Sequence, residues 1–91
     1  MAAAPFIFSF DSIVQGTRSV CAFGHFLIAH HFDGEYEAGE RELYERIQAR
    51  ALEFNSLCNA VVQLDIAVDP WAPGGGTSLT ATGLAVRLEP W

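Results

Sequence analysis

Residues 60–68 read AVVQLDIAV and carry the clearest structural signal in the chain. Apolar and polar side chains alternate along this run, which is the pattern of a half-buried β-strand. The alternation predicts one apolar face, formed by Val62, Leu64, Ile66 and Val68, and one polar face that carries Gln63 and Asp65. The run therefore predicts a strand with one side against a core.

A loop and a second strand follow. Residues 69–76 read DPWAPGGG, and they cannot continue the strand, because proline lacks an amide donor and glycine resists extended order. A strand is predicted over about 78–88, with the small residues Ala81, Gly83 and Ala85 on one face. The opposite face is expected to carry Thr80, Thr82, Leu84, Val86 and Leu88. The two strands should pair antiparallel through the loop.

Upstream of these strands, residues 40–57 have the spacing of a helix. Apolar residues recur at steps of three and four: Leu43, Ile47, Ala51, Phe54 and Cys58. Charged pairs such as Glu42 and Arg46 occupy the other side, in the favourable order for a helix. We expect the apolar stripe to cover the apolar side of the two strands.

The first 39 residues are harder to assign. Phe6, Phe8 and Phe10 alternate with other residues, which predicts a short strand or an extended arm. A further strand is predicted over about 17–23. The segment 24–39 contains three glycines and more apolar side chains than a surface loop normally carries, so it receives no assignment.

Together these elements predict an α+β fold in a single domain, residues 1–91. An N-terminal arm or short strand over 1–12 precedes a β-α-β-β core over 13–91. The expected architecture has two layers, with one long helix packed on a three-stranded antiparallel sheet.

Composition narrows the classes of function. Eleven acidic and five basic residues among 91 give a net charge of -6, which argues against binding to nucleic acid or to anionic lipid. No apolar run approaches the roughly 18 residues that would cross a bilayer, and residues 1–10 lack the pattern of a signal peptide. We therefore expect a cytoplasmic protein with free thiols at Cys21 and Cys58.

The apolar content, 51% of residues, is high for so short a chain. A chain of this size buries only about two-thirds of the surface of its unfolded form, so apolar side chains remain in excess. One tryptophan lies in a proline-rich loop and the other is the last residue of the sequence, positions at which a monomer would expose them. Tryptophan is enriched at protein interfaces relative to the rest of the surface. We expect a homo-oligomer whose interface includes Phe6, Phe8, Phe10, Phe26, Ile28, Trp71 and Trp91.

Potential metal ligands gather in one segment. Cys21, His25, His30 and His31 lie within eleven positions, and their thiol and imidazole groups suit zinc, copper or nickel. Their spacing matches no closed zinc motif. The alternative is that Cys21 is a small strand residue and that the histidines lie in a loop or an interface.

The sequence favours no catalytic site. The run Gly74-Gly75-Gly76-Thr77 lacks the lysine and the following helix of a phosphate-binding loop. Asp65 and Asp69 have no identifiable base or nucleophile beside them. We therefore expect a protein that is not an enzyme.

The second half of the chain resembles a known family. Residues 57–66, LCNAVVQLDI, are similar to the signature Gly-Ala-Asp-Ala-Val-Val-Gly-Ile-x-Ile of the YbjQ-like proteins, which are bacterial proteins described as heavy-metal-binding domains. Residues 81–87, ATGLAVR, resemble the closing strand of that family. Leu57 and Gln63 stand where the signature has its two glycines. The resemblance implies a dodecin-like β-α-β-β subunit assembled as a ring, typically a pentamer.

Two functions follow as expectations. The first is a ring-forming, non-enzymatic oligomer that binds a heavy-metal ion through Cys21, His25, His30 and His31. The second is a metal-free oligomeric scaffold or small-molecule-binding module.

Overall fold

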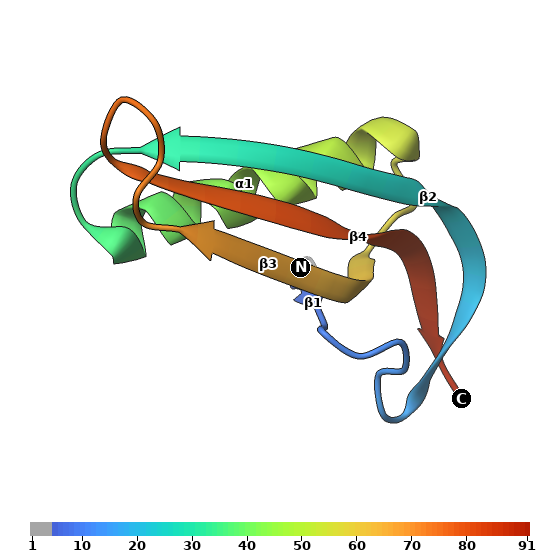
Figure 1. Ribbon diagram of the computed structural model, residues 1–91. Coiled ribbons are helices and arrows are strands. Elements are labelled where there is room, and N and C mark those ends of the chain that lie inside the picture. Colours follow the sequence, from blue (N-terminus) through green and yellow to red (C-terminus); the bar gives the residue numbers. More distant parts are fainter. Residues whose placement is uncertain (1–4) are drawn as a thin grey trace.

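The computed structural model describes residues 5–91, in which one helix lies along one face of a curved four-stranded sheet (Figure 1). The elements in chain order are β1 (Ile7–Phe8), β2 (Thr17–Phe32), α1 (Tyr36–Phe54), β3 (Ala60–Asp69) and β4 (Thr77–Pro90). The sheet order is β1-β3-β4-β2, with β1 parallel to β3 and the other neighbours antiparallel. The predicted α+β fold is confirmed. The short N-terminal strand adds a fourth member to the sheet, and residues 1–4 of the predicted arm lie outside the described residues.

Strand β2 is far longer than predicted, because it runs on through most of the unassigned segment 24–39. Phe26, Ile28 and Phe32 are buried, while Leu27, Ala29 and His31 between them are exposed. This is a strand alternation, and the glycine and histidines interspersed in it conceal the pattern in the sequence. The full length of β2 pairs with β4.

A β-bulge at Gln63 decides which way the side chains of β3 point. Gln63 has a φ of 54°, and the pairing register of β3 with β4 shifts between Val62 and Asp65. Val61 and Leu64 consequently both pack in the cluster beneath α1, whereas Val62 belongs to a second cluster. The prediction that Val62 shares a face with Leu64 is wrong, because the bulge inserts one extra residue between them.

The central strand β4 presents its small residues to the helix. Leu79, Ala81 and Ala85 are buried in the cluster that includes Leu43 and Ile47 of α1. The expectation that the helix covers the face with the larger side chains is corrected. Small side chains leave room for the aromatic rings of β2 between the sheet and the helix, and at Gly83 a Cβ would come within 2.8 Å of Val61 and 3.0 Å of Phe26.

The helix buries three residues of the predicted stripe and one further residue, while Phe54 is half-buried and Cys58 lies beyond the helix end at Phe54. Leu43, Ile47 and Ala51 are inaccessible to solvent, and Gly39 joins them one turn earlier. The aromatic ring of Phe32 occupies the space that a side chain at position 39 would fill. The helix therefore begins at Tyr36, one turn before the predicted start, with a glycine as its contact to β2.

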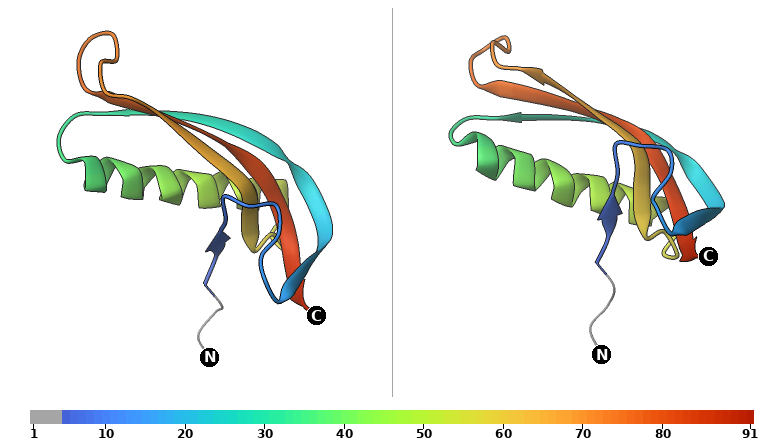
Figure 2. Two further views of the ribbon diagram at one scale, coloured as in Figure 1. Left: turned by 60° about the horizontal axis from the view of Figure 1, so that its bottom comes forward. Right: turned by 90° about the horizontal axis from the view of Figure 1, so that it is seen from below.

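The other face of the sheet is covered in part by the N-terminal segment (Figure 2). Ala60, Val62, Val86 and Leu88 form the second buried cluster, and Ile7 and Val14 pack against it. Backbone hydrogen bonds from Ile7 to Asn59 and from Ser9 to Val61 hold this segment on β3. Asn59 also bonds both backbone groups of Leu88 through its side-chain amide, at 2.8 and 2.9 Å, which ties the start of β3 to β4.

No helix within residues 5–91 combines the length and the apolar character that crossing a bilayer would need.

The contact between Gly39 and Phe32 is testable by mutation. Gly39→Ala should lower the free energy of unfolding by about 1–2 kcal/mol, because overpacking outweighs the gain in helix propensity. In a Phe32→Leu background the same change should cost little, because the smaller side chain frees the space. Urea titration of the four proteins measures this coupling, and Glu45→Ala on the exposed helix face is the control. Equal effects of Gly39→Ala in both backgrounds would contradict the contact.

Candidate functional site

His30, one of the predicted metal ligands, is a clamp between β2 and α1. Its Nε2 lies 3.1 Å from a carboxylate oxygen of Glu42, and its Nδ1 lies 3.0 Å from a guanidinium nitrogen of Arg46. The tautomer that satisfies both contacts donates from Nε2 to Glu42 and accepts at Nδ1 from Arg46. Arg46 also donates to the carbonyl oxygen of Ala29 at 3.0 Å, and the imidazole stacks on the ring of Phe32. Both ring nitrogens of His30 are therefore engaged inside the chain.

The other predicted ligands lie apart along β2. Cys21, His25 and His31 are exposed. Cys21 and His31 are separated by ten residues, or roughly 30 Å of extended strand. Within residues 5–91 no three His, Cys, Asp or Glu side chains come close enough together to hold a metal ion. A single chain thus does not bring the four predicted ligands together.

Cys58 is buried in the core rather than near the histidines. Its thiol donates to the carbonyl oxygen of Ala60 at 3.4 Å, and burial raises the pKa of the thiol above its ordinary value. A raised pKa keeps the thiol protonated and poorly reactive at neutral pH. Cys58 is therefore a packing residue.

The predicted interface residues divide into buried and exposed groups. Phe26 and Ile28 are buried in the chain's own core, and their place in an interface stays a prediction. Phe6 and Phe8 are half-buried against the same core, with the ring of Phe8 edge-on to Tyr44. The remaining three have exposed fractions of 62%, 88% and 85%: Phe10, Trp71 and Trp91.

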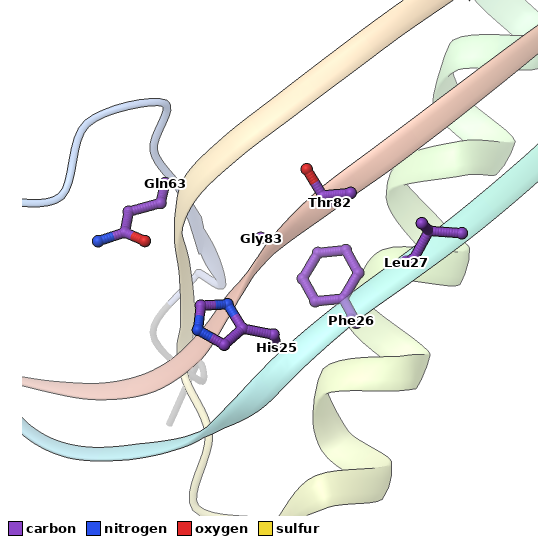
Figure 3. A pocket seen from close by; sticks show the side chains of 6 residues that line it. All are labelled: His25, Phe26, Leu27, Gln63, Thr82 and Gly83. Carbon is purple, nitrogen blue, oxygen red and sulfur yellow. The ribbon is translucent and has the colours of Figure 1, made fainter.

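An open groove of about 480 Å³ lies across three strands on the sheet face away from the helix (Figure 3). Its lining consists of His25, Phe26, Leu27, Gln63, Thr82 and Gly83. The groove lies beside the bulge at Gln63, where the pairing register of β3 with β4 shifts. Sequence reasoning named only His25 and Phe26, since it could not locate the bulge.

Three side chains give the groove its polar character. Within the described part of the chain, His25, Gln63 and Thr82 make no hydrogen bond through their side chains, although each can accept one. The backbone N–H of Gln63 is already bonded to the carbonyl oxygen of Asp11 at 2.9 Å, which holds the bulge in place. The lining includes no carboxylate and no thiol. The polar groups that the groove offers are therefore an imidazole, an amide and a hydroxyl.

Comparisons with known proteins give a likeness to solved structures and no match in sequence. No protein-family model matches the chain, and no curated protein matches it. A solved structure of a protein with unknown function from the DUF74 family of Pediococcus pentosaceus ATCC 25745 is similar, with a TM-score of 0.48 and 11% sequence identity. The similarity covers 94% of this chain and 98% of that one. DUF74 is the YbjQ family.

The two thiols should differ in reactivity. In the native protein we expect Cys21 to react readily with a disulfide reagent, while Cys58 reacts only when the chain opens. Stopped-flow labelling of the Cys21→Ser and Cys58→Ser variants separates the two rates. Fast labelling of the Cys21→Ser variant under native conditions would contradict the burial of Cys58.

Proposed function

We propose that the chain is a non-catalytic subunit of a cyclic homo-oligomer, with five copies the preferred number, and that the assembly serves as a scaffold or small-molecule-binding module. The observation that supports self-association is the set of large apolar side chains that folding leaves exposed. Besides Phe10, Trp71 and Trp91 these are Ile13, Val20, Leu27, Tyr36, Leu52, Leu57 and Val68. Scattered apolar side chains are normal on a monomer, but two almost fully exposed indoles on so small a protein are typical of an interface.

The free edge of the sheet supports the same proposal. Strand β2 is the last strand on its side, and 16 residues of backbone border no further strand. In an antiparallel ladder alternate residues direct both backbone groups to the same side, so β2 presents a row of donors and acceptors at this edge. Only the carbonyl of Ala29 is bonded there by a side chain, that of Arg46, among the described residues. Long open edges of this kind readily pair with another chain.

The backbone at Gln63 supports a relationship to the YbjQ-like proteins and thereby their ring architecture. The second glycine of the family signature falls at this position, and here the chain adopts a φ of 54°. Glycine adopts positive φ without strain, whereas other residues rarely do so. A bulge at this place explains why the signature has a glycine, and this chain keeps the conformation with a glutamine.

Light scattering coupled to gel filtration tests the oligomer. We expect about 50 kDa for a ring of five copies, against 9.9 kDa for one chain. Val20→Asp places a charge on β2 at an exposed position and should reduce the mass, whereas Glu45→Lys on the exposed helix face should not. A wild-type protein that remains at 9.9 kDa at micromolar concentration would end the proposal.

Metal binding stays a prediction, and the geometry adds a condition to it. Because the ligands do not converge in one chain, Cys21, His25 and His31 can form a site only with side chains from another copy. We expect that zinc, copper or nickel binds to the assembled protein and not to the dissociated Val20→Asp chain. Calorimetry on tag-free protein, with the Cys21, His25, His30 and His31 quadruple alanine variant as control, measures this. Equal binding by that variant would exclude these ligands.

A further inference from the structure

The indole of Trp71 projects into solvent from a loop that is held by hydrogen bonds, and its own chain does not bury it. The loop joins β3 to β4 at the end of the sheet opposite the C-terminus (Figures 1 and 2). Ala72 is buried, Asp69 accepts a bond from the Trp71 backbone N–H at 3.0 Å, and Gly75 donates to Ala72 at 3.0 Å. The loop is anchored at these points, yet the adjacent indole is 88% exposed. Such an indole is held ready for contact at little further cost in conformational entropy.

The groove beside Gln63 has the complementary features. Its volume of about 480 Å³ exceeds what a single side chain needs, and Leu27 and Gly83 give it apolar surface. His25, Gln63 and Thr82 offer acceptors without partners in the described chain. An indole N–H is a donor only, and a buried indole usually finds an acceptor. The groove thus supplies both the apolar surface and the acceptor that Trp71 lacks.

We propose that Trp71 of one copy inserts into the groove of the next copy, between His25, Gln63 and Thr82. The inference rests on the proposed self-assembly and names the contact that produces it. Gly83 lies six positions after Thr77, the residue of β4 at the loop. That is about 20 Å of strand, so a chain does not fill its own groove. Donor and acceptor surfaces at different places on one subunit form a head-to-tail contact, which gives a ring when the rotation between successive copies closes and a filament when it does not.

Trp91 is less suited to this role, although it is nearly as exposed. The Arg18 guanidinium lies 5.9 Å from its ring centroid, and its backbone N–H bonds to the carbonyl oxygen of Gly16 at 3.2 Å. These contacts hold the last residue beside β2 of its own chain. Trp71, which makes no such contact through its indole among the described residues, is therefore the better candidate for the groove.

Two disruptive variants and one control test the contact. Trp71→Ala removes the inserted side chain, and Leu27→Glu places a charge at the wall of the groove at an exposed position. Each should raise the dissociation constant of the oligomer by about 30-fold or more, as truncation of an interface anchor does. Glu45→Ala on the exposed helix face is the control and should leave it unchanged. Sedimentation over a dilution series measures the constants, and circular dichroism with urea titration verifies that each variant folds.

Mixing the two disruptive variants gives the sharpest result. The Trp71→Ala chain keeps an intact groove and the Leu27→Glu chain keeps an intact indole, so a mixed pair can form one native contact. Each variant alone should be monomeric, and their mixture should give a heterodimer of about 20 kDa that does not close into a ring. A mere loss of folding in either variant would yield no heterodimer.

Fluorescence of the Trp91→Phe protein reports on Trp71 alone. We expect blue-shifted emission and poor quenching by iodide in the oligomer, and both effects should be lost on dilution. An oligomer whose mass is unchanged by Trp71→Ala, or whose Trp71 is freely quenched, overturns the insertion while the proposed assembly stands. A monomeric wild-type protein overturns both. A small molecule bound in the groove by native mass spectrometry, with Trp71 exposed, would assign the groove to a ligand instead.

Discussion

The bulge at Gln63 is the constraint on which the arrangement of the sheet depends. One residue in the left-handed region lets β3 place Val61 and Leu64 on the helix side and Val62 on the other side. Without the extra residue, Asp65 rather than Leu64 would share the face of Val61 and would meet the core beneath α1. The bulge therefore allows one apolar run to contribute side chains to two separate clusters. The groove lies at the bulge, where the side chains of β3 exchange faces of the sheet.

The clamp at His30 shows how a ligand-type side chain can be used for structure. Its ring is 12% exposed and bridges a carboxylate and a guanidinium on one helix turn. Glu42 and Arg46 are spaced to pair with each other along the helix, but each instead binds the imidazole inserted between them. Because Arg46 also reaches the backbone of β2, the helix and the edge strand are fixed relative to one another at polar contacts as well as through the apolar core.

The sequence predicts those elements whose pattern is local. The stripe at Leu43, Ile47 and Ala51, the last two strands and the loop between them all follow from spacing and turn residues. The length of β2 escapes prediction because its inward rings alternate with histidines rather than with typical surface residues. The groove and the His30 clamp depend on contacts between residues far apart in the chain, and no local pattern encodes them. The bulge could have been predicted only from the glycine that the YbjQ-like signature has at position 63, and this chain has Gln63 there instead.

Large apolar side chains stay exposed in part because one face of the sheet is covered and the other only partly. The helix covers one face, and the N-terminal segment covers the other only in part, with Ile7 and Val14 on the second cluster and Asp11 bonded to Gln63. Beyond that bond the face lies open, and the groove begins there, with exposed Leu27 beside it. A second helix would complete the missing layer in a larger domain. Residues 5–91 contain one helix, which lies on the opposite face, so this part of the sheet stays open in the described chain. In the proposed assembly, neighbouring copies would cover it.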